Sequence, residues 1–241
     1  MQRRRSIYRP TATLLAMLIA SSVRLPAQQH DSWPLASALP FTNNVVGDER
    51  TALNPLSSGV PELILIELSR NPAIRTVEPA RLHRVLASQK LDQPGRIDAE
   101  TASRIGRILG AQWMIHGNFT GDGRGTIRIA AFMVDVATGQ VEHTANAEGK
   151  QANLASLIGQ ISEHLGHDMH LAELPRDSKR AREITQKASY QTTLLFAKAI
   201  EARDAGRVQQ AITMLQQLLA DEPEYEPAKN ELTRLHSDRG R

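Results

Sequence analysis

The stretch that decides the fold spans residues 98–120 and reads DAETASRIGRILGAQWMIHGNFT. Asp98 is a favoured helix N-cap, Glu100 adds negative charge to the first turn, and Gly110 suits the position just past a helix end. Between these signals, apolar residues recur at the three- and four-residue steps of one helix face, at Ala102, Ile105, Ile108 and Leu109. An apolar run over residues 112–120 then predicts a strand. The stretch therefore predicts a capped helix that leads directly into a strand.

Two more strands and a helix are predicted after this strand. The strands cover residues 126–136 and 140–147, and short glycine-containing turns precede each of them, so we expect two antiparallel hairpins. A helix is expected over residues 152–171, where one face is apolar, at Leu154, Leu157, Ile158, Ile161, Leu165 and Met169. These elements indicate a mixed α/β domain in which helices cover a small sheet.

The segment before residue 98 is expected to complete the sheet and its cover. Residues 35–46 predict a short buried strand that runs into a loop, and residues 74–78 predict a second short strand. A helix lies between them and contains Pro61. Either this helix starts near Ser58, which places the proline in the first turn, or the helix is kinked at the proline. The remaining elements are a helix over residues 81–89 and a turn at residues 93–95.

The C-terminal part is expected to be helical and separate from this domain. Residues 174–187 are polar, contain Pro175 and predict a linker. Residues 188–238 then carry two helices, whose spacing fits one helix-turn-helix repeat of about 34 residues, and a capping helix from Tyr225. Small residues allow the paired helices to approach closely. The residues that we predict to contact a partner protein are Leu195, Ala199, Ala202, Ala211, Leu215 and Tyr225.

Residues 1–27 predict a cleavable signal peptide. Arginines at positions 3, 4, 5 and 9 precede an apolar stretch over residues 11–23, which is too short for a transmembrane helix. The tripeptide Leu25-Pro26-Ala27 then suits cleavage. An uncleaved membrane anchor is the alternative interpretation. We therefore expect the chain to be exported to the periplasm.

Charge and cysteine content exclude several classes of protein. The chain has 29 basic and 26 acidic residues, of which five arginines and no acid lie in the predicted signal, so the mature chain has 24 basic and 26 acidic residues. The resulting net charge of −2 gives no basic surface for nucleic acid. The chain has no cysteine, which excludes disulfides, thiolate metal sites and an acylated N-terminal cysteine. We therefore expect any membrane association to be indirect, through a partner.

Histidines at positions 164, 167 and 170 share one predicted helix with Asp168. Successive histidines drift by about 60° around the axis, so the outer two cannot easily meet at one metal ion. His164 and Asp168 could meet, but two ligands make a weak site. A solvated polar face is therefore the favoured interpretation.

Other signals for chemistry are weak. The glycine-rich residues 121–125 join two strands, whereas a phosphate loop leads into a helix, so a hairpin turn is favoured. No nucleophile, acid-pair or metal-ligand motif occurs. We therefore expect no enzyme, no catalytic residues, no cofactor and no metal site.

A string of motifs resembles the CsgG family of curli-secretion proteins and the related FlgO-like and TolB N-terminal-like envelope domains. It comprises residues 77–91, 98–111 and 115–120, with Ala38-Leu39-Pro40-Phe41 and Asp135-Val136-Ala137-Thr138-Gly139. The resemblance covers residues 35–171 and implies a CsgG/TolB-N-like α/β domain over residues 28–173. The C-terminal helix pair resembles a tetratricopeptide repeat, which is a module for protein contacts.

Two departures from the curli channel bear on function. The channel is a lipoprotein, and this chain has no cysteine to acylate. The channel also builds its pore from long hairpins, each strand of which needs about 9–11 residues to span a membrane. Here only six residues lie between Phe119 and Thr126, and three between Val136 and Gln140. We therefore expect the periplasmic domain without the pore.

These features predict a non-enzymatic scaffold or accessory protein for assembly or secretion of an envelope or curli-type complex, with protein partners in the cell envelope. The first alternative is a ring-forming subunit of a curli-type exporter, which implies a homo-oligomer and a pore supplied by another protein. The second alternative is a sensor or enzyme that uses the histidine-bearing helix.

Overall fold

The computed structural model describes residues 33–89 and 97–238. The expected signal peptide over residues 1–27 and the expected turn at residues 93–95 lie outside these described residues. Residues Trp33–Arg241 cluster into one compact unit.

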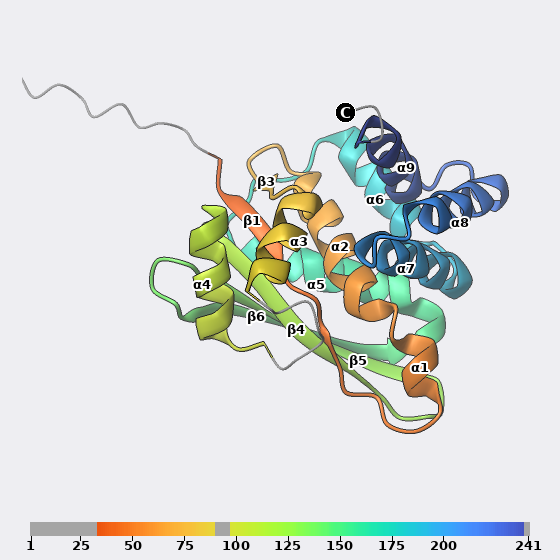
Figure 1. The fold of residues 1–241 in the computed structure, drawn as a ribbon, viewed down its shortest axis with the longest axis horizontal. Helices are drawn as coiled ribbons and strands as arrows, with labels where there is room; N and C mark the ends of the chain where they lie inside the picture. The colour runs from red at the N-terminus through yellow and green to blue at the C-terminus, as the bar shows by residue number, and fades with distance from the viewer. Residues whose placement is uncertain (1–32, 90–96, 239–241) are drawn as a thin grey trace, which may run out of the picture. The chain divides into compact units, whose positions relative to one another are not determined.

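A mixed sheet forms the centre of the fold (Figure 1). Its strands lie in the order β3-β1-β4-β5-β6. The short strand β2 lies outside this order and pairs with β4. The pairings of β1 with β3 and β4 are parallel, and those of β5 with β4 and β6 are antiparallel. The strands are β1 (Leu35–Ala38), β2 (Thr42–Asn43), β3 (Arg75–Thr76), β4 (Trp113–Gly121), β5 (Thr126–Asp135) and β6 (Val141–Lys150). Both predicted hairpins are therefore confirmed.

Helices pack around this sheet and extend the fold at the C-terminal end. They are α1 (Glu49–Leu53), α2 (Leu56–Ser69), α3 (Pro79–Ser88), α4 (Ala99–Leu109), the short 3-10 helix η1 (Gln151–Asn153), α5 (Leu154–Asp168), α6 (Arg176–Gln186), α7 (Tyr190–Asp204), α8 (Val208–Asp221) and α9 (Glu226–Asp238). The predicted fold class, a small mixed sheet covered by helices and followed by a C-terminal helical hairpin, is confirmed.

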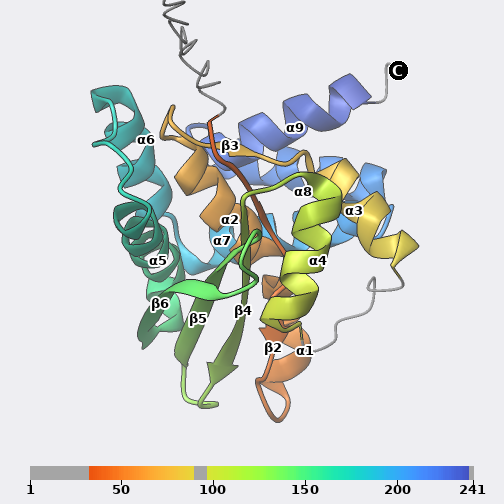
Figure 2. The same cartoon turned by 90° about the vertical axis from the view of Figure 1, so that its left-hand side faces the viewer.

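The two faces of the sheet differ in how much of them is covered. On one face, α2 and α5 bury the alternating apolar residues of the long strands, such as Ile115, Phe119 and Ile129. On the other face, α3 and α4 pack only near the start of β4, over Met114 and Val134. Figure 2 shows α4 and α5 on opposite sides of the strands. The rest of the α4 side carries polar residues and stays open.

Helix α4 has the local signals expected from the sequence. The Oδ1 atom of Asp98 accepts a hydrogen bond of 2.8 Å from the backbone N–H of Thr101, which caps the N-terminus. At the other end, Gly110 has a φ of 67°, which a glycine adopts without the Cβ penalty of other residues. The chain then turns into β4, as predicted.

Pro61 lies inside α2, which begins at Leu56 rather than near Ser58. A proline has no N–H, so it cannot donate to the carbonyl oxygen four residues earlier, that of Ser57. This oxygen instead accepts a hydrogen bond of 2.8 Å from the backbone N–H of Phe41. The proline thus frees an acceptor that ties the segment between β1 and β2 to the helix.

The segment predicted as a linker, residues 174–187, contains a helix that was not expected, α6 (Arg176–Gln186). The sequence shows no apolar stripe there, and only Thr185 is buried. Ionic contacts hold the helix in place instead: Arg182 Nε lies 3.0 Å from Oε2 of Glu67 on α2. The division into one domain that ends at residue 173 and another that begins at residue 188 stays a prediction.

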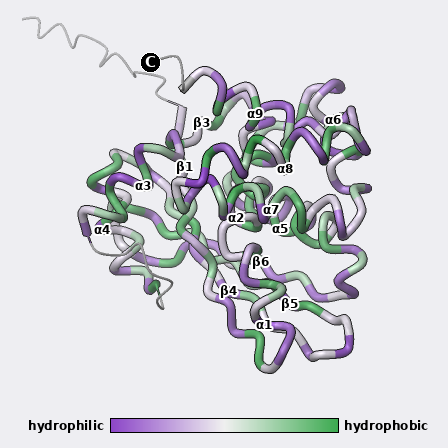
Figure 3. Tube along the Cα trace, turned by 45° about the vertical axis from the view of Figure 1, so that its right-hand side comes forward, coloured by the Kyte–Doolittle hydropathy of each residue, from purple (hydrophilic) through white to green (hydrophobic). Residues whose placement is uncertain are grey.

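Helix α2 is buried on most sides, because it lies between the sheet and the C-terminal helices. Figure 3 shows hydrophobic residues concentrated where α2, α5 and α7 meet. A Cβ atom on Gly59 would lie 2.3 Å from the Cβ of Ala197 on α7, so this glycine permits the two helices to touch. The C-terminal helices therefore share a core with the sheet layer.

Candidate functional site

The six predicted partner-contact residues lie in the helical layer of α7, α8 and α9. Five of them are buried there, with exposed fractions of 0–1%: Ala199, Ala202, Ala211, Leu215 and Tyr225. Leu195 is half-buried. The small side chains do bring α7 and α8 together, as expected. The five buried residues pack within the chain. Contact between the six residues and a partner protein stays a prediction, and Leu195 is the one of the six whose side chain is partly exposed.

A network of buried charges joins this helical layer to α2. Arg203 on α7 lies 3.1 Å from Glu62 on α2 and 3.2 Å from Glu231 on α9. Burial alone would lower the pKa of Arg203, but the nearby carboxylates outweigh it and raise the pKa. Arg203 therefore stays charged and holds three helices together.

The network continues to α3 through one histidine. The Nε2 atom of His83 lies 2.9 Å from Oδ1 of Asp204, which also accepts from Nε of Arg203. Burial tends to raise the pKa of Asp204, but the hydrogen bond from His83 and the charge of Arg203 lower it overall.

A second ionic cluster lies at the other end of α2. Arg70 donates to Glu67 at 2.9 Å, to Glu226 of α9 at 2.7 Å and to the hydroxyl of Thr185 at 2.9 Å. Sequence analysis missed all of these charged residues. Several of their partners are distant in the sequence, such as Glu226 for Arg70 and Glu62 for Arg203, and no local pattern marks a charged residue as buried.

The open face of the sheet carries polar side chains in cross-strand rows. Adjacent residues on β4, β5 and β6 form the rows His116–Phe132–Thr144, Asn118–Ala130–Asn146 and Thr120–Arg128–Glu148. In the last row, Arg128 and Glu148 form an exposed ion pair at 2.6 Å, which contributes about 0–1 kcal/mol to stability. The rows make a flat polar surface beside α4.

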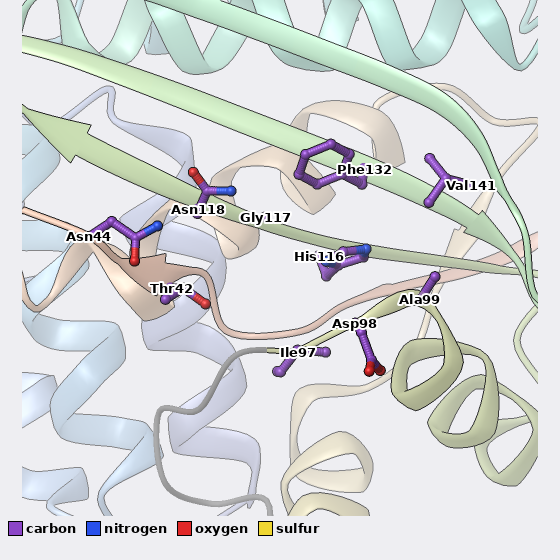
Figure 4. Close-up of a pocket in the computed structure, with 10 residues that line it drawn as sticks. All are labelled: Thr42, Asn44, Ile97, Asp98, Ala99, His116, Gly117, Asn118, Phe132 and Val141. Carbon is purple, nitrogen blue, oxygen red and sulfur yellow. The ribbon is translucent and has the colours of Figure 1, made fainter.

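A cleft of about 600 Å³ opens where this polar surface meets the N-terminus of α4. Figure 4 shows that its walls come from the β2 segment, the α4 start and the strands β4 and β5. The side chains that matter chemically are Asn44, Asp98, His116, Asn118 and Phe132. Gly117 lies between the two β4 residues, and a Cβ there would lie 2.5 Å from the ring of Phe41, so the glycine lets the β2 segment lie close.

His116 is the most unusual group in the cleft. Its Nε2 atom is buried and has no hydrogen-bond partner within residues 33–89 and 97–238. Its ring stacks on Phe132 with a centroid distance of 5.2 Å. Burial lowers the pKa of His116, against the opposing effects of Asp98 and of the Ile97 backbone. His116 belongs to no catalytic or metal-ligand motif in the sequence, and only the fold reveals its neighbours.

The histidines at positions 164, 167 and 170 are exposed, as a solvated polar face requires. Asp168 lies 3.6 Å from His167 and 3.8 Å from His143, and His167 is exposed. Within residues 33–89 and 97–238, no three histidine, aspartate or glutamate side chains group as a metal site would require. The glycine-rich residues 121–125 form a hairpin turn, in which Asp122 accepts from the backbone N–H groups of Arg124 and Thr126.

Comparison with protein families gives a match. It is to the family described as "Curli production assembly/transport component CsgG". Residues 37–128 match the CsgG family. The resemblance inferred from the sequence is confirmed over these residues, whereas the tetratricopeptide-like character of the C-terminal helices is not tested. The CsgG-matching segment runs from β1 into β5 and includes Asp98, His116 and Asn118 of the cleft.

Several solved structures are similar to parts of the chain. The C-terminal domain of LpoB from Escherichia coli is 15% identical, with 52% of this chain and 87% of that chain covered and a TM-score of 0.35. Lipoprotein GNA1162 from Neisseria meningitidis is 15% identical, with 48% and 79% covered and a TM-score of 0.37. A PelC dodecamer structure from Paraburkholderia phytofirmans is 14% identical, with 59% and 91% covered and a TM-score of 0.35. A search of curated proteins gave no match.

Helices of the described part of the chain were also compared with the requirements of a membrane span. None of those in residues 33–89 and 97–238 combines the length and apolar character that a crossing helix needs.

Proposed function

We propose that this chain is a non-enzymatic accessory protein of the cell envelope, which is exported to the periplasm and scaffolds an assembly or secretion complex. The CsgG match over residues 37–128 carries the proposal, because the family is defined by assembly and transport. The polar face of the sheet supports it, since the helices of the described residues leave Thr144, Asn146 and Glu148 exposed there.

Site-specific photo-crosslinking in the producing cell tests this function. A photoreactive residue at Thr144, on the polar face, should capture a specific envelope protein, whereas the same residue at the exposed Gln216 on α8 serves as a comparison surface. Fractionation should place the mature chain in the periplasm or with the outer membrane. A chain that stays in the cytosol, or a periplasmic monomer that gives no crosslink at either position, would contradict the proposal.

The sheet edge favours a second candidate, a ring-forming subunit of an exporter. Strand β6 is ten residues long and lies at the end of the sheet. No backbone hydrogen bond to its outer side is found among the described residues. Such an edge can pair with a strand of another subunit. Negative-stain images of the purified mature chain would show rings if this candidate is correct, and only monomers or dimers if it is wrong.

A further inference from the structure

The cleft beside α4 has the size of a small-ligand site and lies apart from the buried ionic clusters. Its volume of about 600 Å³ falls within the usual range for ligand pockets, roughly 300–1,000 Å³. It lies on the open face of the sheet, between strand β4 and the N-terminus of α4 (Figure 4).

The first observation that points to a ligand is the ring of His116, which lines the cleft and stacks on Phe132. Because burial lowers the pKa of His116, the imidazole is favoured in its neutral form. The ring therefore extends the aromatic surface of Phe132 without adding a charge to the cleft.

The second observation is the character of the other polar groups. Asp98 stays ionised, because the hydrogen bond from the Thr101 backbone lowers its pKa, and it can only accept hydrogen bonds. Asn44 and Asn118 supply amide groups that both donate and accept. No lysine or arginine is among the described residues that line the cleft. The described part of the lining is therefore rich in acceptors, and the negative charge of Asp98 favours a neutral ligand over an anion.

The third observation is an aromatic surface next to these acceptors. Phe132 stacks on His116 and lines the cleft together with Ile97 and Val141. A suitable ligand must therefore combine several hydroxyl donors with an apolar C–H face and no negative charge. Sugar rings have this combination.

We propose that the cleft binds a sugar residue of a neutral glycan. The hydroxyl groups of the sugar donate to Asp98, the amides of Asn44 and Asn118 bond further hydroxyls, and the apolar side of the sugar ring packs towards Phe132 and the ring of His116. This inference adds a ligand to the proposed function and does not depend on which protein partner the chain contacts.

Titration of the mature chain with chitotriose, cellotriose and maltotriose tests the proposal. Binding is followed by NMR, using the ring signals of histidine. At least one of the three sugars should shift the His116 signals in a saturable manner at millimolar concentration. Saturable binding that leaves the His116 signals unchanged, or no binding of any of the three sugars, would overturn the proposal.

Two asparagine variants separate the cleft from the rest of the polar face. Asn118→Ala removes an amide that lines the cleft, and we expect it to weaken sugar binding about tenfold. Asn146→Ala is the matched control, because Asn146 lies in the same cross-strand row but does not line the cleft. It should leave the affinity unchanged. Equal weakening by both variants, or by neither, would contradict binding in the cleft, and unchanged circular dichroism verifies that both variants fold.

Discussion

Replacing Gly59 with alanine tests the shared core of α2 and α7 most directly. A glycine in a helix is less favourable than alanine by about 0.5–1 kcal/mol, so helix propensity alone predicts a more stable variant. The structure predicts the opposite sign. The new Cβ would lie 2.3 Å from the Cβ and 2.7 Å from the Cα of Ala197, whereas carbon atoms pack at about 3.5–4.0 Å.

The clash cannot be relieved by rotating a side chain, because both contacting atoms of Ala197 are fixed to its helix backbone. The helices must separate, and overpacking of this kind costs about 1–3 kcal/mol. Taking the upper part of this range and subtracting the propensity gain, we expect Gly59→Ala to lower the free energy of unfolding by about 2 kcal/mol. For a chain of this size, that corresponds to a fall in Tm of about 4–8 °C.

Urea unfolding followed by circular dichroism measures this change, and Gly166→Ala in α5 provides the matched control. A Cβ on Gly166 meets only Leu68 and Leu171, at 3.7 and 3.8 Å, which is ordinary contact. This control should be as stable as the parent or more stable by up to about 1 kcal/mol. If Gly59→Ala is also as stable as the parent, the close packing of α2 on α7 is refuted. Adding Ala197→Gly should restore part of the lost stability.

Three further predictions follow from the contacts between the layers. Arg203→Met removes the buried cation that Glu62, Asp204 and Glu231 share, while Arg234 and His83 still contact these carboxylates. It should therefore lower the free energy of unfolding by about 3 kcal/mol, at the low end of the cost of breaking a buried pair, in the same urea assay. A change below about 1 kcal/mol would contradict the network. Deleting residues 188–241 exposes the α7-facing side of α2, so the remainder should lose cooperative unfolding, and a sharp unfolding transition would instead support an independent domain. Because the pKa of Asp204 is lowered in the folded chain, its carboxylate adds to the free energy of unfolding at neutral pH. This stabilisation is lost as the pH falls through and below the range of ordinary carboxyl groups, around pH 4. Asp204→Asn should therefore be less stable than the parent at pH 7, with a gap that narrows towards pH 3.

The parts of the fold that depend on local signals were predictable from the sequence. Asp98 and Gly110 mark the two ends of α4 through contacts within a few residues, and the alternating strands around residues 121–125 define their own hairpin. The family resemblance depended on the same region. Local order of this kind is encoded in short stretches, so a single sequence suffices to recognise it.

The parts that depend on distant contacts were not predictable. Helix α6 has no apolar stripe, and it is held by the pairing of Arg182 with Glu67, which lies 115 residues away. Glu67 itself is 1% exposed, although its position in α2 gives no sign of burial. The cleft likewise unites Asn44, Asp98 and His116 from three segments. Its significance depends on the juxtaposition of these polar groups with Phe132, which only the folded arrangement shows.

The burial of α2 against α7 also has a consequence for the order in which the chain folds. Residues 56–69 cannot complete their core until residues 190–204 have been made, so much of the stabilising contact is non-local. Non-local contacts slow folding, because a long loop must close before they form. We therefore expect the nascent chain to remain unfolded until nearly all of it is available. A polypeptide that is threaded through a translocation channel before it folds benefits from such a delay.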